Sequence, residues 1–270
     1  MVYNVRVIEW DDGSNCCLLD SGQGSIFSKE MKPVRFLSRW GFRAPQHLFY
    51  PDFAVSRILF SVEDVIRHEA TTLGLWKEAG IPCPIVLSVS GNRIETTGFP
   101  EAVSYWNLLN NSDSVESYKQ LVTVYSTIRE TAKRYDDPRY LHPDPSLSNF
   151  LYLPEEKTAL AIDPGRLLRR DLDLASLDIL LLVEHLTSLS ALNTSQDVIA
   201  GYVQELRSSL TKVEAERIKA LDHSNPLVAR LYFSLREELG YRFRKRKKKN
   251  PPLSLQKYLE SYQNFIKDLL

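Results

Sequence analysis

The chain has 270 residues, of which 43% are hydrophobic and 25% are charged. This composition is typical of a globular protein with a substantial core and excludes a disordered or fibrous chain. The 34 basic and 34 acidic residues cancel, so net charge argues neither for nor against a polyanionic partner. We find no strong signal for nucleic-acid binding.

The three cysteines indicate a reduced compartment. Cys16 and Cys17 are adjacent and cannot easily bridge each other, and Cys83 is distant, so no disulfide framework is expected. The first residues lack the charged start and apolar stretch of a signal peptide. The longest apolar run, residues 174–186, is short and interrupted by acidic side chains, so it is not expected to span a bilayer. We therefore expect a cytoplasmic protein that can contact the inner face of the membrane peripherally.

Strands are predicted at both ends of the first hundred residues. In residues 2–30, alternating apolar residues are separated by turn signals rich in glycine and aspartate. Residues 85–99 repeat this pattern around a turn at Gly91. The irregular segment 31–60 is aromatic and basic, and it is too apolar for a disordered linker. We expect it to pack against the rest of the chain.

Helices are predicted from residue 61 onward. Ser61 is a suitable N-cap, and Gly80 follows an apolar pattern of helical spacing, which predicts a helix over 61–80. From residue 100 the pattern is mainly helical, with predicted helices at 101–110, 114–135, 173–189, 195–210, 212–221, 225–240 and 254–270. The sequence thus predicts an α+β protein with a strand-rich part, residues 1–99, and a larger helical part, residues 100–270.

A group of polar residues interrupts the helical part. His142, Asp144 and Asn149 lie in a proline-containing loop, and Asp163 follows the second of two short apolar runs separated by a turn at 154–157. The two runs predict a hairpin, which would bring Asn149 close to Asp163. Carboxylate and amide oxygens are suitable ligands for Mg²⁺. The alternative is a turn-rich loop whose Asx side chains cap neighbouring backbone groups.

The same residues resemble the catalytic core of the protein-kinase-like superfamily. That family has a His-x-Asp motif with an Asn five residues after the Asp, followed by an Asp-Phe-Gly motif, and here these are His142-Pro143-Asp144, Asn149 and Asp163-Pro164-Gly165. The resemblance implies a two-lobed fold with an antiparallel-sheet N-lobe at 1–99 and a helical C-lobe at 100–270. It also implies ATP as the phosphate donor, Asp144 as the catalytic base, and Asn149 and Asp163 as ligands of Mg²⁺.

A protein-kinase-like site also needs a lysine on a strand that is paired with a glutamate on the next helix. Glu69 lies in the predicted helix, within a stretch that resembles the smaller bacterial sugar and lipid kinases; the alternative is a solvated glutamate. Lys29 is at a strand end and is the preferred lysine, with Lys32 as the alternative. The usual glycine-rich loop is absent, so backbone amides around Gly13 are expected to cover the phosphates.

The residues after Gly165 indicate which branch of the protein-kinase-like superfamily the chain resembles. A predicted helix follows almost at once, without the long activation segment and Ala-Pro-Glu motif of eukaryotic-type protein kinases. The chain therefore resembles compact relatives: the lipopolysaccharide core kinases that phosphorylate Kdo or heptose, the aminoglycoside phosphotransferases and atypical kinases. This predicts transfer of the γ-phosphoryl group of ATP to a hydroxyl on a lipopolysaccharide-core sugar or related glycolipid. The alternatives are a protein or small-molecule kinase of the same fold and a pseudokinase that acts as a binding module.

Two basic features bear on the acceptor. Residues Arg242–Lys249 form a basic run, which is either a solvated charge run or a patch for the phosphates of an anionic membrane or lipid head group. Three arginines, Arg166, Arg169 and Arg170, follow the predicted metal motif, where an anionic acceptor would lie.

Overall fold

A computed structural model of the chain describes residues 4–8, 14–20, 24–31, 54, 61–111, 115–190, 196–208 and 210–217. The predictions for Gly13, Lys32 and Arg242–Lys249 lie outside these residues. So do most of the segment 31–60 and the helices predicted at 225–240 and 254–270.

The first part of the chain forms a five-stranded antiparallel sheet, with the strand order β1-β2-β3-β5-β4. Its strands are β1 (Asn4–Ile8), β2 (Ser14–Asp20), β3 (Ser25–Met31), β4 (Val86–Ser90) and β5 (Arg93–Thr97). The predicted turn between β4 and β5 is confirmed, and Gly91 adopts a φ of 56° there. A positive φ has little steric cost for glycine, which explains this residue at the turn.

The register of the sheet determines which side chains share a face. Cys16 on β2 pairs with Lys29 on β3, and Lys29 pairs with Ile94 on β5. Directly paired residues point to the same side of a sheet, so these three side chains line one face. All three are buried, and Lys29 is only 5% exposed. A buried lysine on a sheet requires negative partners, because an unpaired charge in a core is very unfavourable.

Helix α2 (Val62–Glu78) confirms the helix predicted over 61–80. Ser61 forms the N-cap, and its hydroxyl accepts a hydrogen bond from the backbone N–H of Asp64, whose carboxylate bonds back to Ser61. This reciprocal capping box satisfies two backbone donors of the first turn. The buried side of the helix includes Trp76, whose Nε1–H donates to the carbonyl of Tyr140, 2.7 Å away. The helix is thereby attached to the segment that leads into the loop at 141–149.

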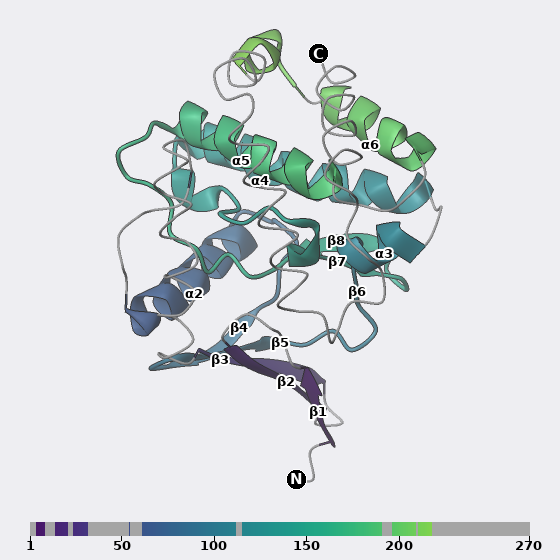
Figure 1. Ribbon diagram of the computed structural model, residues 1–270. Coiled ribbons are helices and arrows are strands. Elements are labelled where there is room, and N and C mark those ends of the chain that lie inside the picture. The colour runs from purple at the N-terminus through teal and green to yellow at the C-terminus, as the bar shows by residue number, and fades with distance from the viewer. Residues whose placement is uncertain are drawn as a thin grey trace, which may run out of the picture.

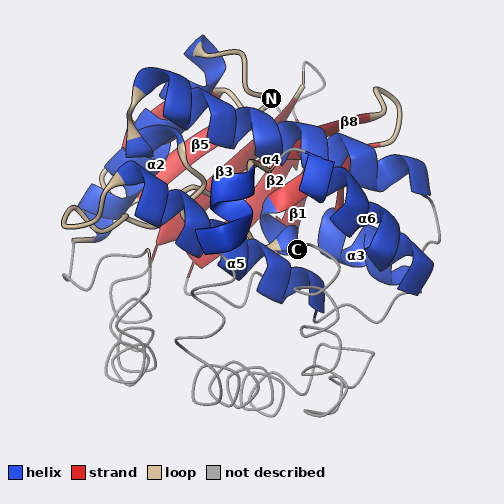
Figure 2. Ribbon diagram, turned by 90° about the horizontal axis from the view of Figure 1, so that it is seen from above, coloured by secondary structure: helices blue, strands red, loops and turns tan. Residues whose placement is uncertain are grey.

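The second part is mainly helical, which confirms the predicted α+β class. Among the elements that the structure describes there are β6 (Val103–Ser104), α3 (Tyr105–Asn111), α4 (Val115–Tyr135), β7 (Phe150–Leu153), β8 (Thr158–Ala161), α5 (Leu174–Ser190) and α6 (Gln196–Ser208). Figure 1 shows α4, α5 and α6 on the opposite side of the molecule from the large sheet, with β6, β7 and β8 between them. Seen from above, the helices cover the sheet (Figure 2).

The helix predicted over 101–110 begins later than expected. Val103 and Ser104 form strand β6 and pair with Tyr152 and Leu151 of β7, so the helix starts only at Tyr105. The pairing partner lies far along the chain, which is why local patterning did not indicate this strand.

The main core joins the two parts. A single cluster of buried side chains contains Ile66 and Trp76 of α2, Ile94 of the sheet, and Leu121 and Ile128 of α4. Because the cluster extends across both parts, removing one of these side chains is expected to destabilise the whole chain. A buried Leu→Ala or Ile→Ala change typically costs about 2–5 kcal/mol.

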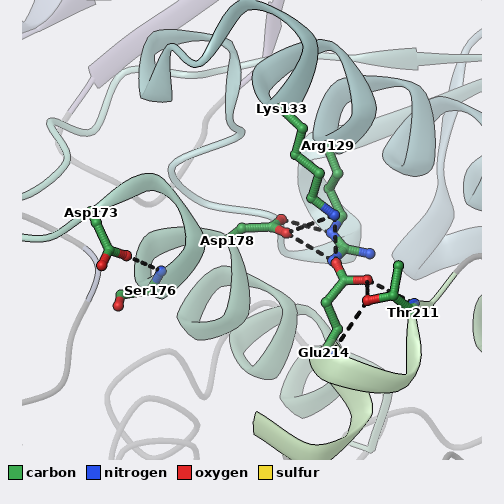
Figure 3. Close-up of polar contacts among 7 residues, drawn as sticks. All are labelled: Arg129, Lys133, Asp173, Ser176, Asp178, Thr211 and Glu214. Atoms are coloured by element: carbon green, nitrogen blue, oxygen red, sulfur yellow. Dashed lines mark hydrogen bonds and ion pairs between the residues drawn. The ribbon is translucent and has the colours of Figure 1, made fainter.

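A buried cluster of charged side chains connects three helical segments (Figure 3). Arg129 of α4 contacts Asp178 of α5 at 2.7 Å and Glu214 at 2.6 Å. Glu214 also accepts a hydrogen bond from Lys133 and one from the backbone N–H of Thr211, at 2.5 and 2.7 Å. Burial by itself would raise the pKa of Glu214, but the hydrogen bonds from Lys133 and Thr211 lower it to about 2. The cluster attaches the helical turn at 212–217 to α4 and α5.

Cys16, Cys17 and Cys83 are free in the structure. Within the part of the chain that the structure describes, no helix combines the length and apolar character needed to cross a bilayer.

Candidate active site

Lys29 lies where the sheet, α2 and the β7–β8 hairpin meet. Its Nζ is 2.8 Å from Oε2 of Glu69 on α2 and 2.6 Å from Oδ1 of Asp163, which follows β8. Burial by itself would lower the pKa of Lys29, but the two carboxylates outweigh it and the pKa is raised. The side chain is therefore a cation at neutral pH, and it links three segments that are far apart in the sequence.

The loop at 141–149 is held in place by His142. Its Nδ1 accepts a hydrogen bond from the backbone N–H of Asp144 at 3.2 Å, and its Nε2 donates to the carbonyl of Ile162 at 3.0 Å. Nδ1 is an acceptor here, so the proton of the neutral ring is on Nε2. Burial lowers the pKa of His142 to about 4, so the ring is neutral at physiological pH. His142 thus fixes the loop against the hairpin and does not carry a proton for a reaction.

The hairpin brings Asn149 and Asp163 to adjoining positions. Phe150 pairs with Ala161, and the backbone N–H of Ile162 donates to the carbonyl of Asn149 at 2.9 Å. Asp163 has a φ of 54°, which is uncommon for a residue other than glycine and is enriched at functional sites. Nδ2 of Asn149 donates to the carbonyl of Asp144 at 2.9 Å, which orients the amide and leaves its oxygen as the atom suited to a cation.

The chemistry of these donors fits Mg²⁺ bound together with a polyphosphate. The described residues contain no cluster of three or more His, Cys, Asp or Glu side chains that could hold a metal by itself. Asn149 and Asp163 offer one amide oxygen and one carboxylate. Mg²⁺ commonly takes only one or two protein ligands and completes its octahedron with water and phosphate oxygens.

Asp144 lies at the outer side of the same site. Its Oδ2 is 2.5 Å from Nη2 of Arg166, and the two side chains are 19% and 25% exposed. Asp144 and Asp163 both act electrostatically on the buried ring of His142, so both carboxylates border the same loop. Gly165 allows the chain to pass close by, because a Cβ there would lie 2.9 Å from Oε2 of Glu69 and 3.2 Å from Oδ1 of Asp163.

A cavity of about 550 Å³ opens between the sheet and the hairpin. This volume is within the range of small-molecule and cofactor sites. Its sheet wall follows from the register, since Leu18, Phe27 and Thr96 share the face of Lys29. Gly98 lies at its edge, where a Cβ would be 2.5 Å from Leu18 Cδ1 and 3.1 Å from the backbone of Ile26. The lining residues are Cys16, Leu18, Phe27, Lys29, Glu69, Leu73, Pro84, Ile94, Thr96, Thr97, Gly98, Phe99, Pro100, Ala102, Ser104, Asn107, Leu151, Ile162 and Asp163.

The structure brings together five of the six residues predicted for the site: Lys29, Glu69, Asp144, Asn149 and Asp163. The sixth, Gly13, lies outside the described residues, as does the alternative lysine, Lys32. The roles assigned to these residues stay predictions.

Sequence reasoning missed a second support for the loop. His185 of α5 is fully buried, its Nδ1 donates to the carbonyl of Pro145 at 2.6 Å, and its Nε2 accepts from the hydroxyl of Tyr202 on α6. Burial lowers the pKa of His185 to about 4, which keeps the ring neutral. Pro145 directly follows Asp144, so α5 and α6 help to position that carboxylate. No local pattern relates His185 to a loop so distant in the sequence.

The described residues have the α+β fold that the sequence predicts: an antiparallel sheet and helix α2 lie against a larger helical part. No protein-family model matches the chain, and no curated protein matches it significantly.

Several solved structures are similar to it. WaaP in complex with acyl carrier protein is 13% identical over 85% of this chain and 90% of that chain, with a TM-score of 0.48. The choline kinase LicA from Streptococcus pneumoniae is 12% identical over 98% of this chain and 92% of that chain, with a TM-score of 0.47. The PknI kinase domain from Mycobacterium tuberculosis is 12% identical over 68% of this chain and 72% of that chain, with a TM-score of 0.38. These similarities concern the fold and not the substrate.

Proposed function

We propose that the protein is a phosphotransferase that moves the γ-phosphoryl group of ATP to a hydroxyl group. In this proposal, Lys29 contacts the phosphates and is oriented by Glu69, Asn149 and Asp163 hold Mg²⁺, and Asp144 orients the acceptor hydroxyl. The strand-rich N-lobe, residues 1–99, binds the nucleotide phosphates, with amides around Gly13 covering them. The helical C-lobe, residues 100–270, carries the catalytic loop and binds the acceptor.

One observation carries the proposal. The buried ammonium of Lys29 contacts Glu69 at 2.8 Å and Asp163 at 2.6 Å at the edge of a cavity of about 550 Å³. This lysine and its two carboxylate partners come from three separate segments, and all three side chains line the cavity. A fixed cation beside an oxygen-rich pair of ligands is the arrangement that phosphoryl transfer requires, because its catalysis is mostly positioning and charge stabilisation.

The chain's own residues account for the individual steps. Asp144 accepts a hydrogen bond from the acceptor hydroxyl and aligns its oxygen with the γ-phosphorus. His142 and His185 hold the loop around Asp144 through the backbone N–H of Asp144 and the carbonyl of Pro145. Lys29 offsets negative charge on the phosphate oxygens. Bound Mg²⁺ would offset more of that charge and orient the phosphates.

The proposed acceptor is a sugar hydroxyl on a lipopolysaccharide core or a related glycolipid. Helix α5 begins at Leu174, soon after Gly165, so the described residues leave no room for a long peptide-binding activation segment. This favours a small-molecule or glycolipid acceptor over a protein. The basic run Arg242–Lys249 is proposed to contact an anionic membrane surface peripherally. A protein or aminoglycoside-like acceptor is the alternative, and phosphate transfer to purified glycolipid, generic protein and aminoglycoside would separate these classes.

Replacement of the proposed metal ligand tests the function. Asp163→Asn is expected to reduce Mg²⁺-dependent ATP turnover by about 10²–10³-fold, because a charge that stabilises the transition state is lost. The control is Asp171→Asn, which removes an exposed carboxylate paired with Arg169. Circular dichroism would establish that both variants fold. Full turnover by Asp163→Asn would contradict the metal assignment.

Nucleotide binding separates an enzyme from a binding module. Mg²⁺ and ATP together, at a hundred times the dissociation constant, are expected to stabilise the protein by about 2.7 kcal/mol in a thermal unfolding experiment. Stabilisation without turnover would indicate a pseudokinase. The absence of any stabilisation would contradict the proposed ATP site.

A further inference from the structure

Asp144, the proposed base, is in contact with an arginine. Nη2 of Arg166 lies 2.5 Å from Oδ2 of Asp144, which is a charge-assisted hydrogen bond. The loop His142–Asn149 contains no lysine or arginine of its own. A positive charge is therefore supplied to this carboxylate by the segment that follows Gly165.

The backbone of Arg166 is held by α2. The ring of His68 makes a hydrogen bond to the backbone of Arg166, and burial, the main cause, lowers the pKa of this histidine. One residue earlier, Gly165 packs so closely on Glu69 that a Cβ would lie 2.9 Å from the carboxylate. The position of Arg166 is thus set by the same helix that orients Lys29, while its side chain extends to the loop and stays 25% exposed.

This contact affects the function of Asp144. A hydroxyl that donates to Asp144 needs a lone pair of the carboxylate, and Arg166 already uses part of that carboxylate. A guanidinium presents five N–H donors in a planar fork that matches carboxylate and phosphate groups. An anionic group on the acceptor would compete with Asp144 for this fork. Binding of such an acceptor would therefore release the carboxylate for the hydroxyl.

We propose that Arg166 is an acceptor-binding residue that exchanges Asp144 for an anionic group of the acceptor, so that the acceptor is a hydroxyl compound bearing a phosphate or carboxylate. This inference rests on the proposed phosphotransferase function. A second positive charge supports it, since Arg170 lies close enough to His68 to act on its ring. Both arginines thus lie near the same residue of α2, and Arg166 contacts Asp144.

The reaction of such an acceptor is balanced without a further reagent. The hydroxyl oxygen forms a bond to the γ-phosphorus as the bond from that phosphorus to the β–γ bridging oxygen breaks. The hydroxyl proton passes to Asp144 and from there to solvent, and ADP leaves with the bridging oxygen. Arg166 stays bound to the anionic group throughout and neither gains nor loses a proton.

The test measures binding in the absence of ATP, with three sugars that share one ring: glucose, glucose 6-phosphate and glucuronate. The full chain is expected to bind at least one of the two anions at least tenfold more tightly than glucose in calorimetric titrations. The anion that it prefers identifies the group. In Arg166→Gln this preference should fall at least tenfold. The control, Arg139→Gln, removes an exposed arginine that pairs with Asp137, and it should keep the preference.

Two results would overturn the inference: equal affinity of the wild-type chain for all three sugars, or an unchanged anion preference in Arg166→Gln. If Arg166→Gln does not fold, the same titrations are made with Arg166→Lys, in which an ammonium keeps the charge but lacks the planar fork. The anion preference should again fall, and an unchanged preference would again overturn the inference.

A further variant separates this inference from the proposed function. Asp163→Asn should keep the anion preference while it loses ATP turnover. Anion binding by a wild-type chain that fails to turn over ATP would support the inference and contradict the proposed function. ATP turnover without an anion preference would support the proposed function and contradict the inference.

Discussion

Replacement of Lys29 by methionine is the most informative single change to this protein. The substitution keeps the length and the apolar stem of the side chain but removes the ammonium that lies between Glu69 and Asp163. Glu69 is only 4% exposed, and the side chain of Asp163 is 29% exposed. The variant therefore leaves two carboxylates facing each other across a poorly solvated space.

The cost follows from Coulomb's law. Two like charges ~5 Å apart at an effective dielectric constant of ~20 repel each other by about 3 kcal/mol. A typical domain has only about 5–15 kcal/mol of stability, so this loss is large. Without the ammonium beside it, the pKa of the Glu69 carboxyl should rise in the folded variant, which then binds a proton that the unfolded chain releases. The destabilisation should therefore shrink as the pH falls from 7 towards 5.

Urea unfolding at several pH values measures this effect. At pH 7, Lys29→Met is expected to be about 3 kcal/mol less stable than the wild type, and the double variant Lys29→Met/Glu69→Gln should recover part of that loss. ATP turnover should fall by about 10²–10³-fold in both, because the phosphates lose a fixed cation. The reasoning is refuted if the single variant is as stable as the wild type, or if its loss depends neither on pH nor on Glu69.

Two further predictions concern buried polar groups of the helical part. His185 has a pKa of about 4 in the folded chain, against about 6.5 for an unperturbed histidine, so the unfolded chain binds the extra proton between these values. The contribution of His185 to the free energy of unfolding should thus be complete above pH 6.5 and fall by about 2 kcal/mol between pH 7 and 5. Urea unfolding of His185→Phe should have a correspondingly smaller pH dependence. An unchanged pH dependence would contradict the assignment of a neutral, buried His185. Arg129→Met leaves the buried carboxylates of Asp178 and Glu214 without their main partner, which typically costs about 3–5 kcal/mol. A shift of the urea midpoint equivalent to less than about 1 kcal/mol would indicate that Lys133 alone holds the cluster together.

The elements that were predicted correctly have local determinants. The capping hydroxyl of Ser61 and the positive φ of Gly80 lie next to the helix that they delimit, and the turn at Gly91 joins two strands directly. The hairpin flanked by Asn149 and Asp163 is also a local structure. These features could be predicted because a cap or a turn depends on a few neighbouring residues.

The features that were missed depend on distant partners. Val103 and Ser104 form a strand only because β7 lies beside them. The bond from His185 to Pro145 and the contact from Arg129 to Glu214 connect residues that are far apart in the sequence. A buried histidine or arginine has the same local pattern whether or not it finds such a partner, so its role was not visible beforehand.

Apart from strand β6, the sequence by itself determined the types and order of the main described elements, and the spacing of the polar residues around one loop and one hairpin, because hydrophobic periodicity and turn chemistry act over short distances. Only the tertiary structure decided that Lys29 meets both Glu69 and Asp163, and that Arg166 pairs with Asp144. These contacts require the sheet, α2 and the hairpin to pack against one another. That packing is set by the shared apolar core, in which a charged side chain is stable only where an opposite charge has been brought to meet it.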